Sequence, residues 1–257
     1  MPTEVRQSSP AEAASSSTEK NAGWVAVMRI IAVAGQKGGV GKSSTALALA
    51  TLGAEAGDRT LVVDVDPQGS ASGWTDMVEA AGLQLPFETV ADTDPKVLSR
   101  MRDGLADQFD TIWVDTPGSL EGADVLRAVI GQADYVITPT RPSVFDLQAT
   151  VRTVRELIEP TGRPYRALLN MVDSRSPKEA EDARTFLDAQ QIATFRTTVR
   201  LLKAHSDGLR DLRLITEARD AAQRKALDDF RGVTMELLAE WARAGQRAAV
   251  AAAEVRS

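Results

Sequence analysis

A glycine-rich run at residues 36–44, Gln-Lys-Gly-Gly-Val-Gly-Lys-Ser-Ser, has the residue types that hold a phosphate group. Glycines let backbone N–H groups turn towards an anion without a Cβ in the way. The N-terminus of the helix expected next adds a partial positive charge. In such a loop Lys42 reaches the β- and γ-phosphates and the Ser43 hydroxyl holds Mg²⁺. The run therefore predicts a nucleoside triphosphate with magnesium as the ligand.

Two further segments place carboxylates at the ends of apolar runs. Residues 61–69 read Leu-Val-Val-Asp-Val-Asp-Pro-Gln-Gly, and strand alternation puts Asp64 and Asp66 on the same face. Residues 111–118 read Thr-Ile-Trp-Val-Asp-Thr-Pro-Gly, and an apolar strand that ends in Asp115 is typical of a Walker B element. Asp115 is expected to bind Mg²⁺ through water, opposite the phosphate loop, with residues 116–118 as a switch that senses the γ-phosphate.

Short β-rich runs alternate with helical stretches along most of the chain. The expected strands are residues 29–34, 60–65, 111–114, 135–138 and 166–172, with a further one at 194–199. The expected helices lie near 43–57, 70–81, 95–106, 120–131, 144–159, 177–190 and 217–247, with Ser143 as the N-cap of the fifth. This order predicts an α/β fold with a doubly wound, mostly parallel sheet flanked by helices, and a ligand at the carboxyl ends of its strands.

The composition bounds the domain organisation and the possible chemistry. Of 257 residues, 43% are hydrophobic and 26% charged, as in ordinary globular proteins. Residues 1–27 are predicted to be a disordered tail, 28–247 a single domain and 248–257 a frayed tail. The absence of cysteine excludes disulfides and thiolate chemistry, and a single histidine, His205, argues against a histidine zinc site. No apolar run is long enough to span a bilayer, and no secretory signal stands out. A cytoplasmic location is expected, and the absence of cysteine fits it.

The phosphate loop departs from the ordinary pattern in an informative way. The position six residues before Lys42 is Gln36 where a glycine is usual, and an additional lysine, Lys37, follows it. The run Lys-Gly-Gly-Val-Gly-Lys-Ser at 37–43 resembles the deviant Walker A motif of the ParA/MinD family of P-loop ATPases. The Asp-Pro-Gln box and the segment 195–198 look closest to the small, ParF-like partition ATPases. The resemblance spans residues 28–241.

The resemblance implies roles for individual residues in a weak Mg²⁺-dependent ATPase. Lys37 would cross a dimer interface to the partner's nucleotide, and Asp66 would orient the attacking water. Catalysis is therefore expected from Lys37, Lys42 and Asp66, and Mg²⁺ binding from Ser43, Asp64 and Asp115. Asn170 is expected to contact the adenine. The residues expected to bind ATP are Lys37, Gly38, Gly39, Val40, Gly41, Lys42, Ser43, Ser44 and Asn170. A proline-rich loop in residues 134–147 resembles one that contributes to the family's dimer face.

The same resemblance implies partners that the composition does not indicate. A net charge of −6 is unusual for a nucleic-acid binder, so DNA contact requires a local basic patch. The expected contacts are Arg200, Lys203, Arg210 and Arg213, with Arg219, Arg224 and Lys225 as weaker candidates. Interspersed aspartates leave an ordinary solvated surface equally open. The expected partners are a second copy in the ATP state, a ParB-like stimulating protein and non-specific DNA of the nucleoid.

Three alternative functions stay open at this point. The same machine positions protein cargo, such as carboxysomes or chemotaxis clusters, in place of a plasmid or chromosome. A MinD-like, membrane-cycling division regulator would need a bulky apolar face, but after Trp241 the chain is mostly alanine, so a membrane partner is not expected. A metabolic P-loop enzyme would need an acceptor site, and the sequence shows none that can be recognised.

Overall fold

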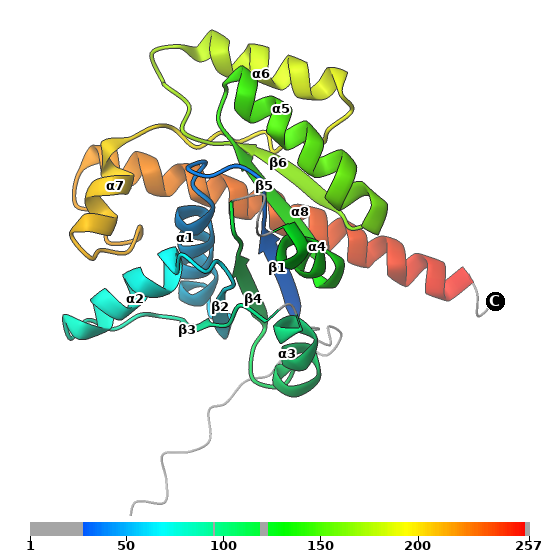
Figure 1. Ribbon diagram of the computed structural model, residues 1–257, viewed down its shortest axis with the longest axis horizontal. Coiled ribbons are helices and arrows are strands. Elements are labelled where there is room, and N and C mark those ends of the chain that lie inside the picture. Colours follow the sequence, from blue (N-terminus) through cyan, green and yellow to red (C-terminus); the bar gives the residue numbers. More distant parts are fainter. Residues whose placement is uncertain (1–27, 95, 119–122, 255–257) are drawn as a thin grey trace, which may run out of the picture.

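The computed structural model describes residues 28–94, 96–118 and 123–254. Its six-stranded sheet has the order β3-β2-β4-β1-β5-β6, and all five pairings are parallel (Figure 1). The strands are β1 (Arg29–Val33), β2 (Thr60–Asp64), β3 (Glu88–Ala91), β4 (Thr111–Asp115), β5 (Tyr135–Thr140) and β6 (Tyr165–Leu169). The predicted doubly wound parallel fold is confirmed.

Helices cover both faces of the sheet (Figure 1). They are α1 (Lys42–Glu55), α2 (Ser70–Ala80), α3 (Val97–Leu105), α4 (Ala123–Gln132), α5 (Val144–Thr153), α6 (Pro177–Ala189), α7 (Lys203–Arg210) and α8 (Ala221–Glu254). Helices α3, α4, α5 and α6 contribute to one buried apolar cluster, and α1, α2 and α8 to another. The sheet therefore lies between two helical layers, each with its own core.

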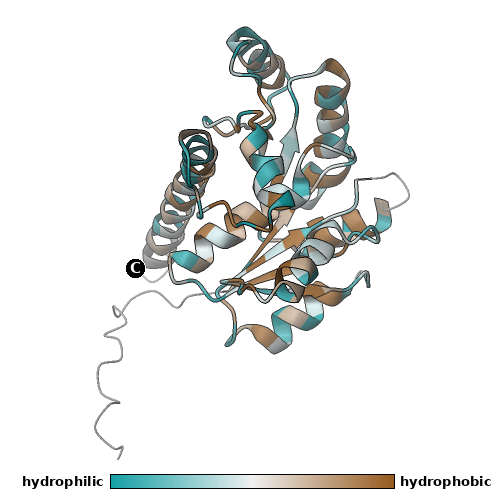
Figure 2. Cartoon of the chain, turned by 90° about the vertical axis from the view of Figure 1, so that its left-hand side faces the viewer, coloured by the Kyte–Doolittle hydropathy of each residue, from teal (hydrophilic) through white to brown (hydrophobic). Residues whose placement is uncertain are grey.

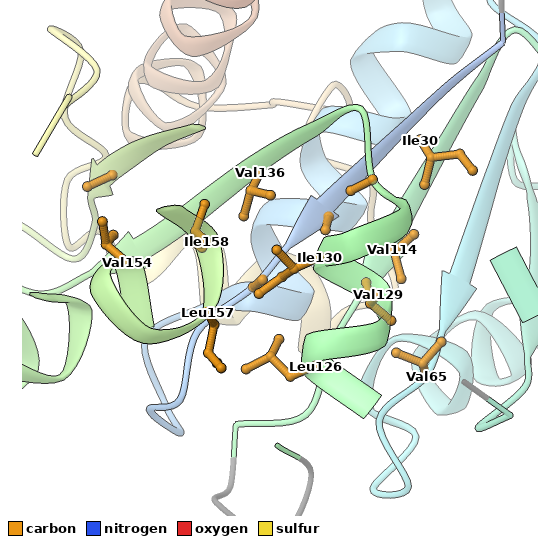
Figure 3. Close-up of a cluster of buried hydrophobic side chains, with 14 of the residues drawn as sticks. Ile30, Val65, Val114, Leu126, Val129, Ile130, Val136, Val154, Leu157 and Ile158 are labelled. Atoms are coloured by element: carbon orange, nitrogen blue, oxygen red, sulfur yellow. The ribbon is translucent and has the colours of Figure 1, made fainter. Parts of the chain in front are cut away.

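The central strand β1 shows how the sequence produces two cores. Ile30 and Ala32 join the cluster that contains α4, whereas Ile31 and Val33 join the cluster that contains α1. Because side chains alternate along a strand, a strand covered on both faces reads as a continuous apolar run. Figure 3 shows the first cluster, in which Ile130 of α4 lies near strand residues of the sheet. The apolar residues concentrate on the central strands and the adjoining helices (Figure 2).

The structure corrects the strand expected at residues 194–199. This segment makes only isolated bridges, Ala167 with Thr194 and Val172 with Arg200, and no regular ladder. The N–H groups of Arg196 and Thr197 donate to the Glu236 carboxylate of α8, at 2.8 and 2.6 Å. Phe195 and Val199 still donate to the β6 carbonyls of Ala167 and Leu169, but the residues between them do not, so the pairing with β6 is interrupted.

Strand β3 and helix α7 were not predicted, and several boundaries differ. The β3 residues, Glu-Thr-Val-Ala, are exposed or half-buried, so no buried apolar run marks this strand. Helix α5 ends early and continues as a π-type turn (Val154–Ile158) and a 3-10 turn (Glu159–Thr161). Helix α8 continues to Glu254, past the expected end at residue 247. The expected tail at residues 1–27 lies outside the described residues. No described helix is long and apolar enough to cross a membrane.

Candidate nucleotide-binding site

A cleft of about 1160 Å³ lies at the carboxyl ends of β1, β2 and β4. Its walls come from the loop before α1, the loop after β2 and the loop after β4, as expected for a doubly wound sheet. Asp64 and Asp115 are register partners at the ends of their strands, and Val33 of β1 lies beside Asp115. The topology thus brings the phosphate loop and the carboxylate segments at the ends of β2 and β4 to the same edge of the sheet. The lining includes Gly38, Gly39, Gly41, Lys42, Ser43, Ser44, Asp66, Gln68, Trp74, Met77, Gly118, Met171 and Leu209.

The phosphate loop has the backbone geometry that its glycines permit. Gly39 and Gly41 adopt left-handed conformations, with φ of 72° and 86°. A Cβ added at Gly38 or Gly39 would meet no atom within 4 Å, so the space beside these residues is open. Val40, in contrast, is buried, and its carbonyl accepts a hydrogen bond of 2.7 Å from the Asn170 side-chain amide. The loop is therefore anchored at Val40 and open at Gly38 and Gly39.

Lys42 lies inside the loop. It is 7% exposed, and its ammonium donates to the Lys37 carbonyl at 3.1 Å. Burial lowers the pKa of Lys42, while the nearby carboxylates of Asp115 and Asp66 act in the opposite direction. A Cβ at Gly118 would lie 2.6 Å from the Lys42 ammonium. The loop after β4 thus approaches Lys42 as closely as glycine allows, and the γ-phosphate-sensing role of residues 116–118 stays a prediction.

Asp115 is a buried carboxylate with unused hydrogen-bonding capacity. It is 0% exposed, and neither of its oxygens meets hydrogen-bond geometry with any described residue. Burial raises the pKa of Asp115 to about 7, although the nearby Ser43 hydroxyl and the Lys42 ammonium lower it. The Ser43 hydroxyl is therefore close enough to stabilise the charge of the Asp115 carboxylate, although it does not meet hydrogen-bond geometry with it. A buried polar group with no partner is costly unless a ligand serves it.

Asp115 and Ser43 fit the predicted magnesium site. Among the described residues, no group of three acidic or histidine side chains forms a metal site by itself. Mg²⁺ needs no such cage, because it commonly takes one or two protein oxygens and completes its shell with phosphates and water. The orphaned oxygens of Asp115, next to the Ser43 hydroxyl, are the donors that such a site requires.

The two aspartates after β2 differ in their surroundings. Asp64 is 1% exposed, and its oxygens accept hydrogen bonds from the N–H groups of Asp66, Ala71 and Ser72 at 2.8–3.0 Å. Asp64 therefore holds the loop after β2 against the start of α2. Asp66 lines the cleft, and one of its oxygens accepts a bond from the Gln68 N–H. The magnesium role of Asp64 and the water-orienting role of Asp66 stay predictions.

Lys37 extends away from the cleft. Its side chain is 46% exposed, and its ammonium lies 3.9 Å from Asp146 of α5, whose carboxylate is 1% exposed. Arg141 and Ser143 donate to the same carboxylate at 2.6 and 2.8 Å, and Ser143 is the N-cap of α5, as expected. The side-chain bonds of Arg141 and Ser143 outweigh burial and hold the pKa of Asp146 below its ordinary value. No sequence pattern indicated that Asp146 faces Lys37.

Asn170 follows β6 and lies beneath the phosphate loop. It is 4% exposed; its amide donates to Val40, and its side-chain oxygen accepts a bond of 2.9 Å from the Met171 N–H. In this structure Asn170 supports the loop, and its contact with adenine stays a prediction.

The four main predicted DNA contacts, Arg200, Lys203, Arg210 and Arg213, are each paired with a carboxylate. Arg200 makes a bidentate interaction with Asp229, with distances of 2.7–3.1 Å. Lys203 and Arg210 lie 3.9 and 3.2 Å from Asp207 of the same helix. Arg210 and Arg213 both pair with Asp211. The pairs of Lys203 and Arg210, whose side chains are 83% and 66% exposed, are of the weak surface kind, worth about 0–1 kcal/mol. Arg200 is different, because its bidentate partner Asp229 is buried.

Comparison with known proteins decides the family. Residues 31–210 match the model of the CobQ/CobB/MinD/ParA nucleotide binding domain. The chain belongs to the ParA/MinD family. Its predicted membership is confirmed, and the cleft described above lies within the matched nucleotide-binding domain of this family.

The relatives of the chain carry names that refer to different processes. The chain is 38% identical, over 213 residues, to maintenance of carboxysome distribution protein A of Gloeobacter kilaueensis. The alignment covers 83% of this chain and 95% of the relative. It is 32% identical, over 196 residues, to the chromosome partitioning protein ParA of Myxococcus xanthus, which covers 60% and 69% of the two chains. MinD of Pyrococcus horikoshii OT3, solved with Mg-ADP, has the same fold, with a TM-score of 0.64, 20% identity and 82% and 96% coverage.

Proposed function

We propose that this protein is a weak Mg²⁺-dependent ATPase that works as a nucleotide-gated switch. In the ATP state two copies form a homodimer, which binds nucleoid DNA without sequence preference. A ParB-like partner on the cargo stimulates hydrolysis, dissolves the dimer and releases the DNA. Repeated cycles segregate a plasmid or chromosome.

The placement of the two lysines is the observation that carries this proposal. Lys42 is buried within the loop and serves the nucleotide of its own subunit, whereas Lys37 is half-exposed and is not part of the cleft lining. A cation beside a phosphate site that does not face its own cleft is suited to the phosphates of a second subunit. Asp146 holds Lys37 in this outward position while no partner is present.

An exposed apolar pair lies next to this lysine. Val144 and Phe145, at the first turn of α5, are 67% and 79% exposed, and Asp146 follows them directly. Leaving two large apolar side chains in water costs about 25 cal/mol per Å² of apolar area. A second copy that covered this turn would remove that cost and bring Lys37 under cover at the same time, which supports the proposed dimer.

Hydrolysis in this proposal is electrostatic. Ser43 and Asp115 would hold Mg²⁺, which would supply positive charge against the phosphates when bound. Lys42 neutralises the β- and γ-phosphates in the same subunit, and Lys37 does so from the partner. Asp66, at the cleft wall, orients a water for attack on the γ-phosphate, with ADP as the leaving group.

A second cargo class is favoured by one observation. The relative that covers 83% of this chain at 38% identity is a carboxysome distribution protein. The same ATP-gated dimer on DNA would then distribute a protein assembly. Capture of interaction partners from the source cells distinguishes the two: a DNA-bound ParB-like protein indicates partition, and a shell-associated protein indicates a protein cargo.

Replacing Lys37 or Asp66 with alanine is expected to slow ATP turnover at least tenfold while MgATP affinity changes less than about threefold, because both residues act mainly in the transition state. Steady-state phosphate release and calorimetry measure the two quantities. Lys178→Ala, which removes an exposed lysine from the start of α6, is the matched control. Turnover at the wild-type rate in either variant contradicts that residue's role.

DNA retention tests the switch and its basic surface together. With random-sequence DNA we expect retention in MgATP, and none in ADP or without nucleotide. Asp211→Asn removes the carboxylate partner of Arg213 and one of the two partners of Arg210, so it is expected to tighten binding about threefold to tenfold at ~100 mM salt. Asp124→Asn on α4 removes one charge, paired with Arg127, and is the control. An equal gain in DNA affinity in both variants would indicate an effect of net charge and not of a local basic patch. Equal DNA retention with MgATP, with ADP and without nucleotide contradicts the switch.

A further inference from the structure

Helix α7 is loosely attached to the rest of the domain. It carries Lys203 and Arg210, yet none of its residues is fully buried. One attachment is to α8, where the His205 ring packs edge-on against Phe230, with ring centroids 5.8 Å apart. Elements with few buried contacts have the lowest local stability and move most readily. Helix α7 is therefore suited to change position without unfolding its neighbours.

A second attachment joins α7 to the nucleotide cleft. The Trp74 indole N–H, from α2, donates to the Leu209 carbonyl at 2.8 Å, and Trp74 is 7% exposed. Both residues line the cleft. Asp64 ties the start of α2 to the end of β2 through Ala71 and Ser72. A continuous set of hydrogen bonds thus runs from the end of β2 through α2 to α7.

A partly open cavity of about 60 Å³ lies between α7 and the core. Its walls are mainly apolar and include Leu47 and Ala48 of α1, Trp74, Leu209 and Phe230. Protein interiors are normally close-packed, and a void deprives its lining of dispersion contacts. Because α7 lacks packing on this side, a shift of the helix costs less than it would in a filled core.

We propose that Trp74 couples nucleotide occupancy of the cleft to the position of α7. A nucleotide that orders the loop at residues 66–69 also orders α2, which follows it, and the Trp74–Leu209 bond makes α7 move with α2. The orientation of Lys203 and Arg210 towards DNA is thereby set by the nucleotide. This inference rests on the proposed function, and it assigns the coupling between the nucleotide cleft and α7 to the Trp74 side chain.

Hydrogen exchange of the full-length protein, with and without saturating MgATP, tests this coupling. In the wild type, ATP is expected to slow exchange at least fivefold in both residues 66–80 and residues 203–213. In Trp74→Phe, which keeps an apolar ring and loses the N–H donor, protection of 66–80 is retained and protection of 203–213 falls below twofold. The ratio of DNA affinity in ATP to that in ADP falls in parallel.

Trp241→Phe is the control, because the Trp241 ring contacts Arg29 and Tyr135 away from the cleft. Wild-type protection of 203–213 in Trp74→Phe overturns the coupling and leaves the proposed function standing. Absence of any ATP-dependent protection in the wild type counts against the proposed function itself. Calorimetry beforehand establishes that each variant is saturated.

Filling the cavity provides a second variant, independent of Trp74. Ala48 lines the cavity and is not part of the nucleotide cleft, so Ala48→Val is expected to keep MgATP affinity. The added methyl groups pack against α7 and restrict it, so residues 203–213 exchange slowly already without nucleotide and ATP adds less than twofold. Unrestricted exchange there, with the wild-type response to ATP, contradicts the role of the void.

Discussion

Replacing Gly41 with alanine is expected to reduce MgATP affinity at least 100-fold. Gly41 has a φ of 86°, and an added Cβ would lie 2.4 Å from the Asn170 amide nitrogen and 3.3 Å from the Met171 side chain. Asn170 is buried and bonded to Val40, so it moves only by breaking the bond that anchors the loop. Left-handed strain and the displaced amide together predict a loss of about 2–4 kcal/mol of stability.

Gly38→Ala is the matched control within the same loop. A Cβ at Gly38 meets nothing within 4 Å, so without nucleotide its stability is expected to stay within about 0.5 kcal/mol of the wild type. Denaturant unfolding of the nucleotide-free proteins and calorimetric titration with MgATP measure both effects. If Gly41→Ala is as stable as Gly38→Ala and binds MgATP normally, the loop geometry described here is wrong.

Asp115→Asn is expected to stabilise the nucleotide-free protein and to abolish the stabilisation that Mg²⁺ adds to ATP binding. Burial raises the pKa of Asp115 from its ordinary value of 3.8 to about 7, and this value already includes the attraction of Lys42. Above pH 7 the ionised carboxylate therefore costs the folded state up to about 4 kcal/mol. A neutral amide of the same shape removes that cost, but it is a poor Mg²⁺ ligand.

The raised pKa also fixes the sign of a pH dependence. Between pH 3.8 and about 7 the folded state holds a proton on Asp115 that the unfolded state has lost, so this group's contribution to stability falls as pH rises through that window. The free energy of unfolding, compared at pH 6 and 8, is expected to change less in Asp115→Asn than in the wild type. Asp76→Asn, an exposed aspartate of α2, is the control. Equal pH dependence of the free energy of unfolding in all three proteins would show that the pKa of Asp115 is not raised.

The fold class and the phosphate-binding face follow from local patterns in the chain. Apolar runs of strand length alternate with helical stretches, and parallel strands joined by helices place every βα loop at one edge of the sheet. The glycines and lysines at 37–42 and the carboxylates at the ends of β2 and β4 therefore had to meet once that topology formed. The alternation of strands and helices and the motifs at the strand ends are both local in the chain, so short-range geometry suffices to produce them.

Contacts between side chains that are distant in the chain could not be predicted from those patterns. Lys37 pairs with Asp146, Arg200 is held by Asp229, and the Glu236 carboxylate takes the backbone donors of an expected strand. Each contact depends on the direction in which α5 and α8 cross the sheet, and no periodicity in the sequence encodes that direction. The bond from Trp74 to α7 likewise exists because two helices, distant in sequence, pack against the same cleft wall.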